Sequence, residues 1–105
     1  MQLISAIKNV IMLSPSRIGR IFFKCVISNL DNVVSVKFFP TGQWVDPFIP
    51  PHEIFDGSDK FHYQERWHQT GMAIGSLEHF LTENNHSFTV SDIINNEYIE
   101  VTINV

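Results

Sequence analysis

The amino-acid sequence predicts an α+β fold, in which an antiparallel sheet built from two β-hairpins packs against one or two helices. Two turn pairs, Asp31-Asn32 and Asn95-Asn96, each separate segments in which apolar and polar residues alternate. Such alternation is typical of strands with one buried and one solvated face. Apolar residues also recur at helical spacing over residues 3–11 and 59–83. Helices laid across one shared sheet would bury the apolar faces of both hairpins.

Length and composition favour a single folded domain over residues 1–105. Hydrophobic residues make up 44% of the chain and charged residues 17%, which is unlike a disordered chain. We predict no membrane association, because no apolar run approaches the roughly 20 residues of a spanning helix. Residues 1–13 lack the basic start and cleavage site of a signal peptide. Cys25 is the only cysteine, which favours a reducing compartment and a cytoplasmic location.

The first two elements are a short helix and a hairpin. Apolar residues over 3–11 predict an amphipathic helix that ends at Ser14-Pro15. Asp31 and Asn32 both tolerate positive φ, which suits a two-residue turn. Counting outward from this turn places apolar residues opposite one another on one face: Ile27 with Val36, and Cys25 with Phe38.

The segment "WVDPFIPPHEIFDG", residues 44–57, contains three of the five prolines and cannot be a helix or a central strand. Glu53-Ile54-Phe55 is its best candidate for a strand. Its aromatic residues, Trp44 and Phe48 among them, stand between acidic residues. We interpret this segment as a surface for another macromolecule. The alternative is that Trp44 and Phe48 fold back as a lid on the sheet.

Residues 59–83 are predicted to form a helix with one apolar stripe, made of Trp67, Gly71, Ile74, Leu77 and Leu81. Gly71 and Gly75, four residues apart, would let this stripe approach the sheet closely. The alternative is that Gly71 divides the segment into two shorter helices. Asn84-Asn85 ends the element.

The second hairpin joins residues 88–94 to residues 98–105. Counting outward from its turn again pairs apolar residues on one face: Val90 with Val101, and Phe88 with Ile103. Asp92 would then lie on the apolar face opposite Ile99. We therefore expect a bulge or a strand end at Asp92.

Charge is distributed unevenly along the chain. Residues 1–40 carry five basic residues and one acidic residue, whereas residues 41–105 carry two basic and ten acidic residues. The overall net charge is −4, and no basic residue follows Arg66. If the carboxylates converge in space, their field would attract a basic partner and repel phosphate. Ordinary surface charge kept for solubility is the alternative.

Catalytic and metal-binding patterns are weak. His62, Glu65 and His68 share part of a helix face, but their spacing differs from that of the zinc-protease motif. Cys25 lies in mid-strand on the predicted apolar face, where a thiol is inert. We predict no enzyme activity, no resident metal and no cofactor. A small metal protein or enzyme centred on His62, Glu65 and His68 is the alternative.

Nucleic-acid binding is a further alternative that charge argues against. Basic and aromatic residues of the first hairpin could line one sheet face: Arg20, Phe22, Lys24, Lys37 and Phe39. Such a mixture is typical of surfaces that bind single strands. The remainder of the chain is strongly acidic, so we predict that the protein does not bind nucleic acid.

The size, element order and acidic C-terminal segment "SLEHFLTENNHSFTVSDIINNEYIEVTINV" resemble small bacterial immunity proteins, including partners of contact-dependent growth-inhibition toxins and other polymorphic toxins. The resemblance implies a cytoplasmic inhibitor that occludes the basic active-site cleft of a cognate toxin, such as a nuclease. The residues expected to contact this partner are aromatic or acidic: Trp44, Asp46, Glu53, Glu78, Glu83, Asp92, Glu97 and Glu100. A regulatory subunit that self-associates through a free sheet edge, such as the C-terminal strand, is the remaining alternative.

Overall fold

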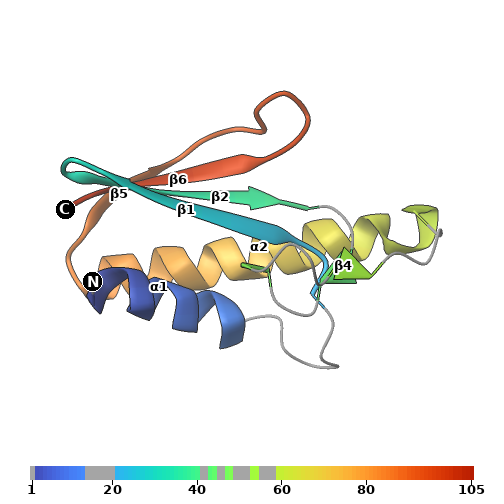
Figure 1. Cartoon of the computed structure of the whole chain (residues 1–105), viewed down its shortest axis with the longest axis horizontal. Coiled ribbons are helices and arrows are strands. Elements are labelled where there is room, and N and C mark those ends of the chain that lie inside the picture. Colours follow the sequence, from blue (N-terminus) through green and yellow to red (C-terminus); the bar gives the residue numbers. More distant parts are fainter. Residues whose placement is uncertain (1, 14–20, 41–42, 45–46, 49–52, 55–58) are drawn as a thin grey trace.

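The computed structural model describes residues 2–13, 21–40, 43–44, 47–48, 53–54 and 59–105. For residues 43–44, 53–54 and 59–65 it describes only the course of the backbone. Two helices, α1 (Gln2–Leu13) and α2 (Asp59–Glu83), lie on one face of a four-stranded antiparallel sheet (Figure 1). This two-layer arrangement confirms the predicted α+β fold.

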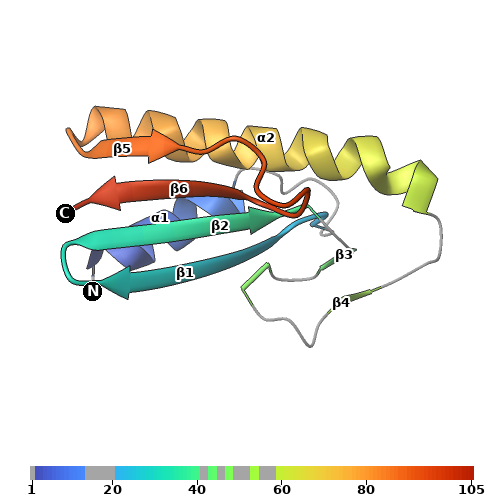
Figure 2. The same cartoon turned by 90° about the horizontal axis from the view of Figure 1, so that it is seen from above.

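The sheet has the order β1-β2-β6-β5. Its strands are β1 (Lys24–Leu30), β2 (Val33–Phe39), β5 (Ser87–Val90) and β6 (Ile99–Asn104). Each hairpin contributes two neighbouring strands, and the β2–β6 pairing joins the hairpins (Figure 2). The C-terminal strand β6 therefore lies inside the sheet, and the expectation that it forms a free edge is wrong. The edges are β1 and β5.

The predicted registers are confirmed in both hairpins. Ile27 pairs with Val36 and Cys25 with Phe38 in the first hairpin, where Asp31 occupies the turn with a φ of 56°. In the second, Val90 pairs with Val101. Strand β5 ends at Val90, as expected from the position of Asp92, and residues 91–98 form a loop.

The core lies between the sheet and the two helices. Its fully buried members include residues of α1, α2 and the inner faces of β2 and β6: Ile7, Ile11, Val34, Val36, Phe38, Leu77, Leu81, Val101 and Ile103. The other face of the sheet is not covered by either helix (Figure 1). Alternation along the strands therefore separates a buried face from an open face.

Helix α2 is continuous through Gly71, so the alternative of two shorter helices is wrong. The predicted role of its glycines is also wrong, because Gly71 and Gly75 are exposed and nothing lies within 4 Å of a Cβ built on either. Thr70 and Ala73, both fully buried, occupy the face that the glycines were expected to share. Ile74, Leu77 and Leu81 of the predicted stripe are buried as expected, and Thr70 and Ala73 join them in place of Gly71.

A second, two-stranded sheet joins β3 (Gln43–Trp44) to β4 (Glu53–Ile54). The predicted strand at residues 53–55 is confirmed for Glu53 and Ile54, while Phe55 lies outside the described residues. Phe48 packs against the core and the Nζ atom of Lys8 lies 5.5 Å from its ring. At Phe48, then, the segment folds back on the domain, as the lid alternative requires.

Candidate functional site

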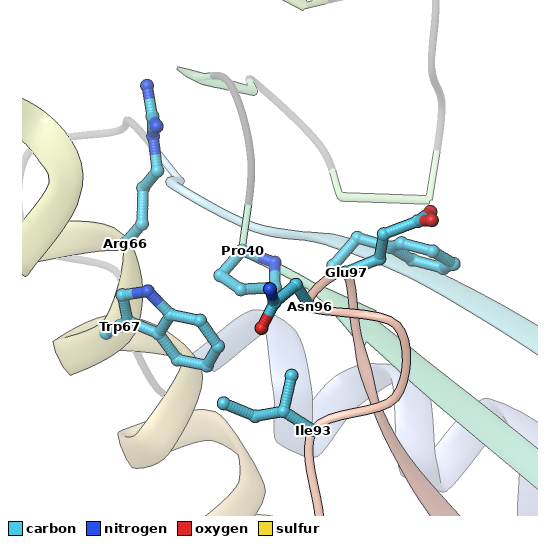
Figure 3. Close-up of a pocket in the computed structure, with 7 residues that line it drawn as sticks. Pro40, Arg66, Trp67, Ile93, Asn96 and Glu97 are labelled. Carbon is cyan, nitrogen blue, oxygen red and sulfur yellow. The ribbon is translucent and has the colours of Figure 1, made fainter. Parts of the chain in front are cut away.

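A pocket of about 510 Å³ lies where β2 ends, beside α2 and the loop between β5 and β6 (Figure 3). Its lining combines aromatic, apolar and charged side chains: Phe39, Pro40, Arg66, Trp67, Ile93, Asn96 and Glu97. The indole ring of Trp67 points from α2 toward Ile93 and Asn96, while the Arg66 side chain points away from them. The pocket thus places an aromatic ring beside a loop that carries carboxylates.

The loop that closes this pocket is held by its own hydrogen bonds. The N–H groups of Ile94 and Glu97 donate to the carbonyl groups of Tyr98 and Ile94, at 2.8 and 2.9 Å. Asn95 and Asn96 have φ angles of 53° and 57°, which asparagine tolerates better than most residues. The loop therefore has a defined conformation before any partner binds, and ordering it on binding costs little.

Two predicted partner-binding residues, Asp92 and Glu97, belong to this loop and are exposed. Within residues 66–105, for which side chains are described, neither carboxylate forms an ion pair. Ile93, between them in the loop, is 48% exposed although it is large and apolar. Exposed carboxylates beside an exposed apolar group and an aromatic ring are typical of protein interfaces.

The other predicted residues lie elsewhere or are described only in part. Trp44 and Glu53 pair across β3 and β4, toward the same end of the molecule as the loop (Figure 2). Asp46 lies outside the described residues. Glu83 ends α2, 16 residues beyond Trp67, which corresponds to about 24 Å along the helix axis. Its carboxylate lies 3.8 Å from the Nε2 atom of His79.

Glu78 and Glu100 are the remaining residues that were predicted to contact a partner. Glu78 is half-buried on α2, between Trp67 and Glu83. Glu100 lies on the open face of β6, where it accepts a hydrogen bond from the Ser35 hydroxyl and faces Lys37 across the strands. The predicted acidic residues whose side chains are described therefore divide among the loop, the open sheet face and the later half of α2. Asp92 and Glu97 are the two that belong to the same loop.

The open face of the sheet carries a second group of cations and aromatic rings. The Lys24 Nζ atom lies 5.1 Å from the Phe39 ring, and the Lys37 Nζ atom lies 5.2 Å from the Tyr98 ring. The two rings are 5.0 Å apart. This confirms the predicted proximity of Lys24, Lys37 and Phe39. Each lysine already lies over a ring, which occupies the stacking surface that a nucleotide base would need.

Phe22 and Arg20 were also predicted to line this open face of the sheet. Phe22 is buried, and its N–H donates to the Gln69 Oε1 atom at 3.0 Å, so its predicted place on the open face is wrong. The hairpin alternation does not extend to Phe22, because β1 begins at Lys24. Arg20 lies outside the described residues.

The described residues offer little for catalysis or metal binding. Burial raises the pKa of the Cys25 thiol well above its ordinary value, because the apolar surroundings disfavour the thiolate. Among the described residues, no three His, Cys, Asp or Glu side chains are grouped to hold a metal ion. His68 is exposed on α2, and the side chains of His62 and Glu65 lie outside the description.

Comparisons of the chain with models of protein families, with characterised proteins and with solved structures find no match. Within the described part of the chain, neither helix has the length and apolar content needed to cross a bilayer. Function is therefore inferred from the geometry of the molecule.

Proposed function

We propose that the protein is a non-catalytic inhibitor that binds a basic protein, and that the pocket beside the loop between β5 and β6 forms the contact. One observation supports this proposal above the others. Trp67 and Glu97 line the same pocket, and the loop that carries Glu97 and the exposed Asp92 already has a defined shape.

The chemistry of this surface suits lysine and arginine side chains. A cation is attracted to the face of an indole ring, and another cation to a carboxylate such as that of Glu97, which points away from Trp67 in Figure 3. The rim of the pocket carries Asn96, whose amide can donate to or accept from a polar group. Arg66 also lines the pocket, and its guanidinium points away from Trp67. A partner side chain would therefore approach from the loop side.

The partner that we propose is a toxin domain with a basic active-site cleft, such as a nuclease. A nuclease cleft binds phosphates, and the carboxylates of an inhibitor can occupy the same positions. The acidic residues that favour this partner would repel a nucleic acid directly. Occlusion of this kind is how immunity proteins protect the cytoplasm of the cell that makes a toxin, and we propose the same location here.

The test is affinity capture from the cells that produce the protein, with the wild-type chain and three variants immobilised. Trp67→Ala and the pair Asp92→Lys/Glu97→Lys should each lower recovery of a basic protein at least tenfold, or about 1.4 kcal/mol. The matched control, Glu78→Lys/Glu83→Lys, makes the same charge change on the later half of α2 and should bind normally. The captured protein should lose its hydrolytic activity when the wild-type chain is added.

Two results would contradict the proposal. If both charge-reversed pairs lowered recovery equally, binding would depend on net charge and not on the pocket. If the captured protein kept full activity in the complex, the chain would be a binding partner but not an inhibitor.

A further inference from the structure

The edge of the sheet formed by β1 has hydrogen-bonding groups that point away from β2. The Cys25 N–H donates to the Pro47 carbonyl at 2.9 Å, outside the β1–β2 ladder. Because the direction of N–H groups alternates along a strand, the Ile27 N–H also points outward. None of the described residues accepts a hydrogen bond from it. The Pro47 contact shows that an outward N–H group of this edge bonds to a carbonyl group from outside the four-stranded sheet.

A groove of about 440 Å³ runs beside this edge, between β1 and α1. Ile4 and Lys8 line it from the helix, Val26 and Ile27 from the strand, and Phe48 closes it. Ile4, Ile27 and Phe48 are half-buried, and Val26 is 45% exposed. A strand edge beside an apolar groove is the arrangement that peptide-binding domains use when a ligand adds a strand to a sheet.

Charge identifies the segment that would fit. Helix α1 and strand β1 contain no acidic residue, and their charged residues are Lys8 and Lys24. Lys8 lies at the groove, with its Nζ atom 5.5 Å from the Phe48 ring. Two copies of this edge would supply lysines from α1 and β1 but no carboxylate from these elements to pair with them. An acidic segment would place opposite charges in contact.

We propose that the β1 edge binds an extended acidic segment of a partner protein by strand addition. The backbone of the segment bonds to the outward N–H and C=O groups of Ile27, an apolar side chain enters the groove, and a carboxylate lies beside Lys8. This site is separate from the pocket beside Trp67, so each can be disproved without the other.

The experiment is an NMR titration of the intact chain with a synthetic peptide, acetyl-Ser-Val-Glu-Val-Glu-Val-Ser-amide. We expect the largest shifts at the Ile27 amide and around Lys8, and slower hydrogen exchange at Ile27. The Lys8→Gln variant should weaken binding at least threefold. Lys37→Gln is the matched control, because it also removes one lysine that lies over an aromatic ring, and it should not alter affinity.

Modified peptides test the backbone contact without risk to the fold of the protein. A strand uses alternate N–H groups to pair with its neighbour. N-methylation of one alternate set of peptide residues should abolish binding, and methylation of the other set should be tolerated. Tolerance of both sets would overturn strand addition. A peptide with lysine in place of glutamate should bind at least tenfold more weakly, and equal binding would overturn the assignment of an acidic ligand.

Two further outcomes would also overturn the proposal. One is the absence of any shift with the acidic peptide up to roughly 5 mM, an affinity too weak to be specific. The other is protection of the Ile27 amide that rises with protein concentration in the absence of peptide, together with dimerisation in light scattering. That result would assign the edge to a second copy of this chain.

Discussion

At the scale of single residues, the end of α2 depends on the backbone of Asn85. Its φ is 60°, and the His86 and Asn85 N–H groups donate to the Leu81 and Thr82 carbonyl groups at 2.9 and 3.2 Å. This is a Schellman motif, in which the residue after the helix adopts a left-handed conformation. The predicted end of the helix at Asn84-Asn85 is confirmed.

We predict that Asn85→Ala lowers the free energy of unfolding by about 1 kcal/mol, because a Cβ without a local hydrogen-bonding side chain disfavours positive φ. Asn85→Gly should be at least as stable as the wild type. Asn85 is exposed, so neither change removes core packing. Denaturant titration of the three proteins measures the difference. A loss of stability in the glycine variant would show that the side chain, and not the backbone angle, sets the helix end.

Gln69 is a buried polar residue whose role the sequence does not reveal. It is 3% exposed and accepts the hydrogen bond from the Phe22 N–H. We predict that Gln69→Met lowers the free energy of unfolding by about 2 kcal/mol, because the buried N–H loses this acceptor. Thr70→Val is the control. Thr70 is also buried, but its hydroxyl bonds to the Arg66 carbonyl in its own helix, and the change should cost under about 1 kcal/mol. Equal costs would contradict this assignment.

At the scale of elements, the exposed glycines of α2 weaken a helix that they do not help to pack. A Cβ at Gly71 or Gly75 would meet open space. We predict that Gly71→Ala and Gly75→Ala each raise the free energy of unfolding by about 0.5–1 kcal/mol, because alanine loses less backbone entropy in a helix. Thermal unfolding would measure this gain in stability. The affinity for the basic protein partner should be unchanged. A loss of binding would indicate that this exposed face contacts a partner.

Elements defined by local chemistry were predicted closely, whereas the small residues at the interface between helix α2 and the rest of the core were not. The hairpin registers follow from Asp31-Asn32 and from strict alternation, which a one-residue slip would invert. The face of α2 was predicted correctly at Ile74, Leu77 and Leu81 but not at Gly71, because glycine was taken as the small residue at the interface. Thr70 and Ala73 occupy that interface instead. Glycine, alanine and threonine are all small enough to let a helix approach the sheet closely. The sequence pattern does not decide which of them lies at the interface.

At the scale of the whole molecule, the candidate pocket depends on contacts between distant segments. It joins Phe39 and Pro40 to Trp67, and both to the loop at Ile93–Glu97. Trp67 was assigned to the core stripe because its spacing fits the helix period. Asp92 and Glu97 were predicted as partner residues from charge alone; the fold puts both in the loop between β5 and β6, and Glu97 lines the pocket with Trp67. It places Glu83 at the far end of α2, and Glu100 on the open face of β6, where its backbone bonds to Ser91 beside Asp92. Neither position can be read from net charge.

Charge on the loop should determine how fast a basic partner associates more than how long it remains bound. We predict that the association rate constant of the captured partner falls roughly tenfold between 50 and 500 mM NaCl, because salt screens exposed carboxylates. The dissociation rate should change much less, because it depends on the packing of Trp67 and Ile93. Stopped-flow or surface-binding kinetics would measure both rates. Asp92→Asn/Glu97→Gln should flatten the salt dependence, and Glu78→Gln/Glu83→Gln should leave it largely intact. If the association rate of the wild type did not respond to salt, electrostatic attraction could not be what selects the partner.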